Sequence, residues 1–458
     1  MREFPAHRQI LSVRLSPLEQ DTIQTSIDAS SNLPEGPAPA PQSRIAMFRP
    51  LRIRDFALLW TGLSVSLLGD GIYYVALPVQ VYAISNVPTA LSVVGVAWTL
   101  PLVLFLLLGG LISDRFDRRR VMMTADLIRV VAIGGIGVLS VSGALELWHV
   151  IALAALYGIG DAIFNPAFGA IVPDVVPKHM LTEANSLDQF VKPFMLRLIG
   201  PGIGGLLVGL LGAGGAFMID GATFLVSAIA IYFMRPRPHA SDTEVTLATA
   251  RADIATGFAF VKAHAWLWGT LLAAAVALLT FLGPFQVLVP FVIKNHLDGS
   301  PQDIGWVYAL GGAGGIIGAI VIGQRGLPRK HILFMYLSWA VSAFAVAGFG
   351  FAGSLWQMWI ASLVMGATNT ASLVVWGTLM HRLVPSEMMG RVHSFDWLVS
   401  VALVPLSFAL TGPISQAIGE ETTLIGAGVL GGGSLFIFLL FVRGLRDSET
   451  DGSIHPLA

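Results

Sequence analysis

Long apolar stretches alternate with short polar breaks along most of the chain, from Phe56 to Val442. Each stretch has about 20 residues, which is enough for a helix to cross roughly 30 Å of hydrocarbon. Runs such as VVGVAWTLPLVLFLLLGGLI do not alternate between apolar and polar positions, as the strands of a membrane barrel would. The pattern therefore predicts an all-α membrane protein with about twelve spans, at 56–83, 88–112, 120–142, 147–172, 188–211, 215–234, 266–293, 302–324, 331–352, 355–380, 391–417 and 422–442.

The longest polar break, at 235–264, divides six predicted spans from six. Its proline-rich start and amphipathic later part are typical of a linker with a short surface helix. The related segments VPKHMLTEANSLD and VPSEMMGRVHSFD follow the fourth and tenth spans, which indicates a duplicated unit. We therefore expect a disordered tail at 1–47, a six-helix bundle at 48–234, the linker at 235–264, a second bundle at 265–445 and a tail at 446–458.

Charge is scarce and unevenly distributed. Charged residues make up 12% of the chain, hydrophobic residues make up 55%, and the mean hydropathy is +0.74. Of the 27 Lys and Arg residues, only Lys294 falls in a break reached after an odd-numbered span. The positive-inside rule then predicts a multi-pass protein of the plasma (inner) membrane with both termini in the cytoplasm.

Composition limits the possible ligands. Cysteine is absent, which excludes disulfides and thiolate metal sites, and the histidines show no metal-ligand spacing. A net charge of −1 indicates no particular partner. We therefore expect no bound metal and no nucleic-acid partner.

The seven residues 114–120, between the second and third spans, include two aspartates and four arginines. A cluster that merely fixes orientation would explain the arginines but not the aspartates or the preceding Gly110. The segment resembles the G-x-x-x-D-R-x-G-R-R loop of the major facilitator superfamily, with Asp117 where that pattern has glycine. The resemblance implies that the glycine allows two helices to approach closely and that the charges form a breakable clasp to helix ends of the opposite half, at the cytoplasmic side. The residues so implied are Gly110, Asp114, Arg115, Arg118 and Arg119, with Asp174 as the partner of Arg118 and Arg391 close to Asp114.

Two further runs extend the resemblance over nearly all of 48–445. The run from Phe164 to Phe190 and the GPGIGG segment at 200–205 look like the enterobactin-exporter and macrolide-efflux branch of the superfamily. The GPxxGG pattern is also the final part of an antiporter motif, although an ordinary glycine-rich helix contact is a competing interpretation. Its residues are Gly200, Pro201, Gly204 and Gly205.

Several ionisable side chains fall inside predicted spans of the first half. Each costs about 2.5–3.5 kcal/mol at mid-membrane, so each is a functional candidate. Asp70 and Asp161 lie near the middle of their spans, and either could alternately hold a proton or a cationic substrate, with Arg129 modulating its affinity for protons. Asp126 precedes Arg129 by three residues, and for these two we favour a static ion pair. Asp220 is expected close to an outer helix end, where it could be a solvated cap.

The second half has almost no charge at mid-membrane, which indicates an apolar or aromatic cavity wall. Bulky amphipathic ligands commonly stack on aromatic side chains, although most membrane aromatics only contact lipid or neighbouring helices. The wall candidates are Tyr73, Tyr74, Phe164, Phe285, Gln286, Asn369 and Trp376.

The resemblance implies a major facilitator fold of two pseudo-symmetric six-helix bundles and a secondary transporter. Each half alone would leave cavity-facing polar groups in lipid, so we expect the twelve-span chain to be functional as a monomer, with a dimer as the alternative. We expect it to export small hydrophobic or amphipathic molecules, drugs or siderophore-like compounds, in antiport with protons. An importer or facilitator of a nutrient or lysolipid is the alternative. No lysine follows a glycine, so the chain has no G-x-x-x-x-G-K-[ST] loop, and an ATP-driven pump would need a partner ATPase. We expect no enzyme activity and no cofactor, the proton gradient being the energy source.

Overall fold

The computed structural model describes residues 46–235, 247–442, 444–446 and 449. Both predicted tails lie almost wholly outside these residues, as does the beginning of the predicted linker. Throughout the described part every element is a helix, which confirms the all-α prediction. The helices of the first half are η1 (Ala46–Arg52), α2 (Arg54–Ile84), α3 (Pro88–Arg115), α4 (Arg118–Val141), α5 (Leu147–Val175), η2 (Lys178–Met180), α6 (Leu181–Pro193), η3 (Phe194–Ile199) and α7 (Gly200–Tyr232).

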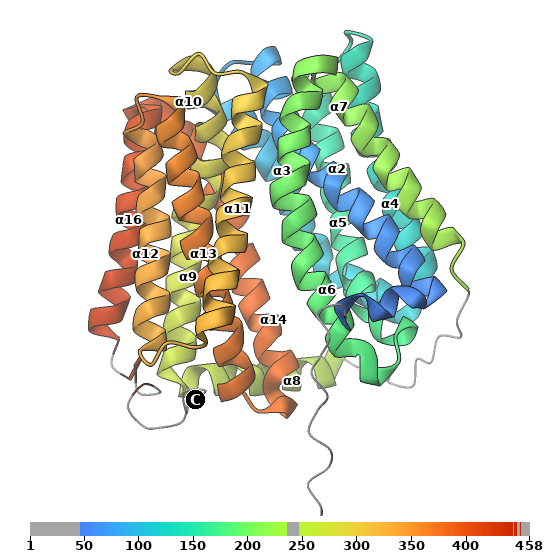
Figure 1. Cartoon of the computed structure of the whole chain (residues 1–458), viewed down its shortest axis with the longest axis vertical. Helices are drawn as coiled ribbons and strands as arrows, with labels where there is room; N and C mark the ends of the chain where they lie inside the picture. Colours follow the sequence, from blue (N-terminus) through green and yellow to red (C-terminus); the bar gives the residue numbers. More distant parts are fainter. Residues whose placement is uncertain (1–45, 236–246, 443, 447–448, 450–458) are drawn as a thin grey trace, which may run out of the picture. The chain divides into compact units, whose positions relative to one another are not determined.

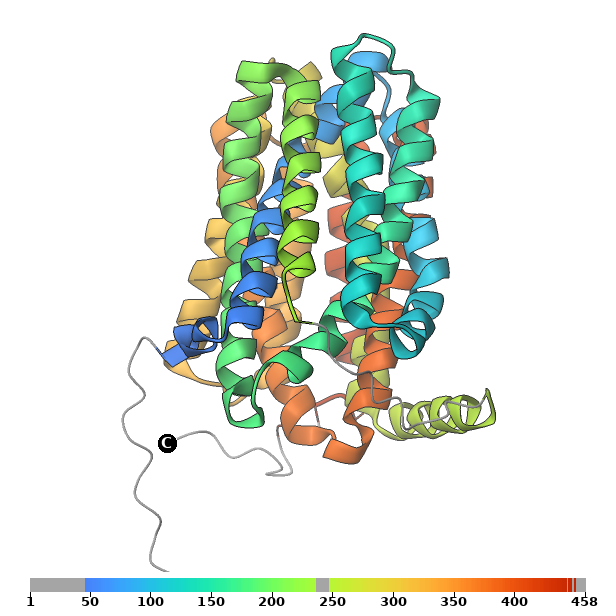
Figure 2. The same cartoon turned by 90° about the vertical axis from the view of Figure 1, so that its right-hand side faces the viewer.

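The second half follows α8 (Leu247–Ala263), which falls in the predicted linker. Figures 1 and 2 show α8 running across the ends of the other helices, and α8 packs against α14. Figure 1 also shows the helices of the first half (blue to green) beside those of the second (yellow to red). The helices of the second half are α9 (Ala265–Gly283), η4 (Pro284–Leu288), α10 (Val289–Asn295), α11 (Pro301–Arg325), α12 (His331–Gly350), α13 (Leu355–Leu383), α14 (Ser386–Ala402), α15 (Val404–Ile418) and α16 (Glu420–Phe441).

Local sequence accounts for several helix ends. Ser300 and Asp303 form a capping box at the start of α11, where each side chain bonds a backbone N–H of the other residue. Pro88 occupies the first turn of α3, where its missing N–H has no helical partner to lose. Gly419 separates α15 from α16 with a φ of 89°, a conformation that favours glycine.

Eleven stretches of the described chain are long and apolar enough to cross a membrane, whereas the sequence predicts twelve spans. The difference arises at Lys178–Tyr232, a single stretch of 55 residues that covers the fifth and sixth predicted spans. Within it, Gly212 has a φ of 72° and a ψ of 169°, which interrupts the helical backbone of α7. Only glycine adopts this conformation without strain.

The two parts of α7 run past α2 in opposite directions. In the first part, higher-numbered residues contact higher-numbered residues of α2, whereas in the second part the order is reversed. The chain therefore turns back at Gly212, and the described helices are consistent with twelve crossings. The contacts that give this order are Gly200–Gly71 and Gly204–Val75 before the break, and Asp220–Gly69 and Ser227–Gly62 after it.

The two halves are joined by hydrogen bonds at the end where α2 stops and α10 ends. The Tyr82 hydroxyl donates to the Val287 carbonyl at 2.7 Å. The Lys294 ammonium donates to the Tyr82 carbonyl at 2.7 Å and to Asn86 Oδ1 at 3.1 Å. Asn86 also donates to Asn295 Oδ1 at 2.7 Å. Lys294, the one basic residue predicted on the outer side, thus helps to hold this end of the two halves together.

Candidate functional site

Arg129 on α4 is the centre of a buried polar network in the first half. Its guanidinium lies 2.8 Å from Asp161 Oδ1 on α5 and 3.3 Å from Asp126 Oδ1, one turn earlier on α4. The same group lies over the ring of Phe164, at 4.2 Å, and over that of Phe224, at 5.3 Å. The exposed fraction is 4% for Arg129 and 0% for Asp126. A charge buried this deeply needs such partners, because desolvation costs several kcal/mol.

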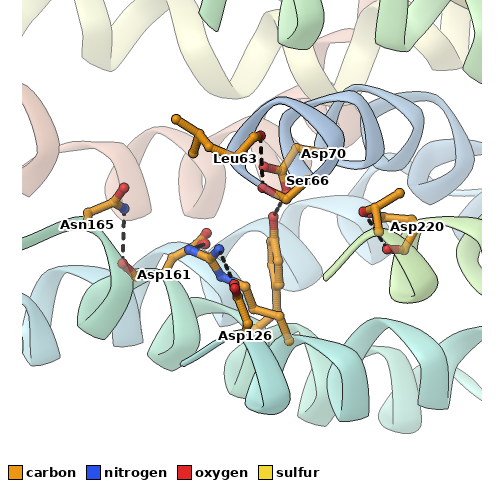
Figure 3. A network of polar contacts seen from close by, with 10 residues as sticks. Leu63, Ser66, Asp70, Asp126, Asp161, Asn165 and Asp220 are labelled. Carbon is orange, nitrogen blue, oxygen red and sulfur yellow. Dashed lines mark hydrogen bonds and ion pairs between the residues drawn. The ribbon is translucent and has the colours of Figure 1, made fainter. Parts of the chain in front are cut away.

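Two aromatic donors complete the network. The second oxygen of Asp161, Oδ2, accepts a hydrogen bond from the indole N–H of Trp98 on α3, at 3.1 Å. Asp70, midway along α2, accepts a hydrogen bond from the Tyr157 hydroxyl at 2.5 Å. Tyr157 and Asp161 lie four residues apart on α5 and therefore share a helix face. Both mid-membrane carboxylates singled out in the sequence are thus directed into the protein, where Figure 3 shows them from close by.

Asp220 on α7 belongs to the same region and is not the solvated cap that the sequence suggests. It is 0% exposed, and its carboxylate packs against Gly69, the residue before Asp70. The Thr223 hydroxyl donates to its backbone carbonyl at 2.7 Å. The reason is the position of the turn: Asp220 lies eight residues past Gly212, or about 12 Å along the returning helix.

The network has more acid than base. The four carboxylates, against the one guanidinium of Arg129, would leave a net charge of −3 if all were ionised; they belong to Asp70, Asp126, Asp161 and Asp220. Such an excess is unfavourable among apolar helices unless protons or a cation neutralise it. The chemistry open to the network is therefore reversible uptake of protons or of a cationic ligand.

A small hollow lies between the two halves, and we name it the interhalf pocket. Aromatic rings dominate its wall, Gln286 contributes one amide, and the named lining residues include no charged side chain. Trp98 belongs to this wall and to the acidic network. The pocket is lined by Tyr73, Tyr74, Leu77 and Pro78 of α2, Leu91, Gly95 and Trp98 of α3, Gln286 of η4, Tyr308 of α11 and Phe408 of α15.

The predicted wall residues fall into two groups. Tyr73, Tyr74 and Gln286 line the interhalf pocket. The others are not among its lining residues: Phe164 covers the Arg129 guanidinium, and Phe285 packs its ring 5.7 Å from that of Phe349. Asn369 and Trp376 lie on α13, where the Trp376 indole donates to Asp396 at 3.4 Å.

Sequence reasoning missed Trp98, Tyr308 and Phe408 as wall residues and Tyr157 as a partner of Asp70. A span that is apolar all round has no periodic signal to show which aromatic faces a cavity. Trp98 carried one usable signal, since a buried indole N–H needs an acceptor. Gly95 carried none, yet the Phe408 ring of the other half lies directly against it.

The charged segment between α3 and α4 is bound largely within the first half. Arg118 lies 2.5 Å from Asp174 at the end of α5, the contact that the sequence suggests. Arg119, expected in a clasp to the opposite half, instead donates to the Ile231 carbonyl at 2.9 Å and to the Tyr232 carbonyl, at the end of α7. Asp117 accepts a hydrogen bond from the Arg119 backbone N–H at 2.9 Å and so caps α4, which gives the aspartate a role at a position where the family pattern has glycine.

The close approach expected at Gly110 occurs one residue earlier. A Cβ atom at Gly110 would meet nothing within 4 Å, whereas one at Gly109 would overlap the Ala162 carbonyl of α5. Successive helix residues point about 100° apart, so only one of the two can face α5. Asp114 and Arg115 lie in the last turn of α3, and Arg391 lies on α14, where Gly257 of α8 packs against its side chain.

The GPxxGG segment packs α7 between two helices. Gly200 and Gly204 face α2, while Pro201 and Gly205 face Gly305 of α11, in the other half. A Cβ atom at Gly205 would lie 3.2 Å from the Gly305 Cα. The segment therefore joins helices both within the first half and across the two halves.

Gly200→Ala is expected to destabilise the protein by about 1–3 kcal/mol, the usual cost of overpacking. Its Cβ would lie 2.7 Å from the Gly71 Cα and 2.9 Å from the Leu68 carbonyl oxygen, so two backbones would have to separate. Thermal unfolding in detergent measures the effect. Gly169→Ala is the matched control, because a Cβ there meets no atom within 4 Å. Equal melting temperatures for the two variants would contradict the role of Gly200 in packing.

Known proteins match this chain over most of its length. The family model described as "Transmembrane secretion effector" matches residues 45–454. The multidrug efflux pump Tap of Mycolicibacterium fortuitum is 28% identical over 389 residues, which cover 82% of this chain and 91% of that protein. Macrolide efflux protein A of Streptococcus pyogenes is 22% identical over 378 residues, or 82% and 93% of the two chains. A solved bacterial homolog of the human lysosomal transporter Spinster has a TM-score of 0.66 at 16% identity, covering 86% of this chain and 98% of that one.

Proposed function

The chain belongs to the transmembrane secretion effector family of the major facilitator superfamily, a superfamily of transporters, and we propose that it exports small hydrophobic or amphipathic molecules in exchange for protons. The observation that carries the proposal is an acidic network with excess carboxylates directly behind an aromatic pocket at the boundary of the two halves. Such an arrangement provides a site for substrate and a separate site for protons. The protein would act as a single chain in the plasma membrane, with both termini in the cytoplasm.

The interhalf pocket suits substrates with flat or apolar surfaces. Tyr74, Tyr308 and Phe408 offer ring faces from both halves, and the Gln286 amide can orient one polar group. Siderophore-like compounds and drugs share this chemistry. Because the wall combines side chains from both halves, relative movement of the halves would change the affinity for substrate.

Proton exchange would take place in the network around Arg129. The bonds of Tyr82 and Lys294 keep the predicted outer end of the two halves together in this structure. Opening that end would expose the pocket to the exterior, where protons are more abundant and can be taken up by Asp70 or Asp161. The return movement would release those protons to the cytoplasm, which makes export of the substrate favourable.

Two of the relatives compared above are named as efflux proteins, which supports export over import. An importer of a nutrient or lysolipid would move its substrate from the exterior into the cytoplasm. The direction of movement in a defined vesicle distinguishes these functions.

Inside-out membrane vesicles with an acid interior and no ATP are expected to accumulate ethidium when they contain this protein. Ethidium fluorescence reports the accumulation, and nigericin, which removes the pH gradient, should abolish it. Vesicles from cells with an empty vector are the control. Accumulation that persists with nigericin would contradict proton exchange, accumulation that needs ATP would indicate an ATP-driven partner, and accumulation only in right-side-out vesicles would indicate import.

A further inference from the structure

We propose that Trp98 is a positioning residue that couples occupancy of the interhalf pocket to proton binding by Asp161, an inference that rests on the proposed function. The indole ring of Trp98 lines the pocket, and its N–H donates to Asp161 Oδ2 at 3.1 Å. One side chain thus contacts both the expected place of the substrate and the expected place of the proton. The pocket wall named above has no carboxylate, so coupling has to pass through an uncharged residue.

At Trp98 the backbone is fixed by its neighbours, so a ligand in the interhalf pocket would act on the indole side chain. Gly158 of α5 packs directly on the Trp98 carbonyl, which fixes the backbone of α3 at this point. The indole itself is half-buried, stacks on the Tyr157 ring at 6.2 Å and meets the Tyr74 ring edge-on at 6.3 Å. A flat ligand among these rings would set the orientation of the indole.

The indole N–H and a proton compete for the same atom. Asp161 Oδ1 is bound by Arg129 at 2.8 Å, which leaves Oδ2 as the oxygen that accepts from Trp98. With substrate in the pocket, the indole is held as in this structure, and its N–H favours the ionised carboxylate. Without substrate the indole is free to leave this orientation, and whenever it turns away an O–H bond forms at Oδ2 with a proton taken from water. Binding of substrate then breaks that bond and returns the proton to water.

Coupling through Trp98 predicts that substrates need not carry a charge. Because the signal passes through a ring contact and not through an ion pair, an uncharged aromatic compound displaces the proton as well as a cation does. Chloramphenicol, which is neutral, and ethidium, which is a cation, are suitable probes. Both are expected to release protons when they bind the purified transporter.

Trp98→Phe removes the N–H and keeps an aromatic ring, so it separates the two roles. The purified variant is expected to bind ethidium within a few-fold of the parent affinity but to lose most of the proton release, followed with a pH-sensitive dye in weak buffer. For the parent, the affinity should rise by up to about tenfold per pH unit where one proton is displaced. For the variant the affinity should be nearly independent of pH. Trp359→Phe on α13, a partly buried tryptophan outside the pocket lining, is the matched control and should behave as the parent.

A second substitution tests whether the loss of proton release comes from the missing N–H or from misfolding. Replacement of Trp98 by benzothienylalanine keeps the shape of the indole and exchanges the N–H for sulfur. Proton release equal to the parent in either variant would overturn the role of Trp98 while leaving proton-coupled export intact. If the parent binds ethidium and releases no proton, the exchange mechanism itself is wrong. Loss of release in both variants with binding retained supports the coupling.

Discussion

Arg129→Met is expected to reduce the stability of the protein by about 3–5 kcal/mol, the usual cost of leaving a buried charge without its partner. Asp126 and Asp161 would both lose the guanidinium, at 3.3 and 2.8 Å respectively, and neither is reached freely by water. Methionine has a similar length and fills the space beside Phe164, so the loss reports charge and not a cavity. The amount of monodisperse protein extracted from membranes and its melting temperature in detergent measure the effect.

Arg325→Met, at the exposed end of α11, is the matched control and should change stability by less than about 1 kcal/mol. Adding Asp161→Asn to Arg129→Met is expected to recover part of the stability, because the amide removes one uncompensated charge. A melting temperature unchanged by Arg129→Met would show that the network is already neutralised without its arginine. A double variant less stable than the single one would show that Asp161 stabilises the fold by some means other than this ion pair.

The positions of Asp70, Asp161 and Arg129 could be predicted because a charge in a long apolar run is unusual whatever the packing. Their mutual arrangement could not be predicted, since it depends on how α2, α4 and α5 are rotated about their axes. Asp126 and Arg129 are the exception, because three residues along one helix fix a shared face. The structure then adds Asp161 as the second partner of Arg129, at the shorter of the two distances.

The ends of a membrane helix are harder to predict from sequence than the presence of the helix. The sequence puts Asp220 close to a helix end, whereas the turn at Gly212 puts it well inside the returning helix and next to Gly69. Glycine is frequent in membrane helices, so no single glycine identifies a turn from sequence. Sequence is equally ambiguous for Gly109 and Gly110, two adjacent glycines of which only Gly109 faces α5.

The contacts of Arg119 could not be predicted from the family motif. Family likeness indicates charges that act between the halves, but this arginine binds carbonyl groups at the end of α7 in its own half. The final carbonyls of a helix lack backbone partners and carry partial negative charge, so they attract a nearby guanidinium strongly. A motif therefore predicts which residue types are present more securely than it predicts what they contact.

Asp161→Asn is expected to abolish proton-driven accumulation of ethidium in inside-out vesicles. A gradient of one pH unit is worth about 1.4 kcal/mol per proton and can hold about a tenfold concentration ratio of substrate. The amide is close in shape to the carboxylate and its oxygen can still accept from Trp98, but it cannot take up and release a proton at that site. The accumulation ratio should therefore fall from about ten to about one in a one-unit gradient.

Equilibration separates loss of coupling from loss of transport. Asp161→Asn should still let external ethidium exchange with ethidium already inside the vesicles, because the interhalf pocket named above does not include residue 161. Asp126→Asn removes the longer of the two ion pairs and is expected to reduce accumulation less. Glu421→Gln, an exposed acid at the start of α16, is the matched control for removal of a carboxylate. Accumulation by Asp161→Asn at the parent level would transfer the coupling role to Asp70, whose Tyr157 bond is independent of Asp161, and would leave the indole of Trp98 without a proton to displace.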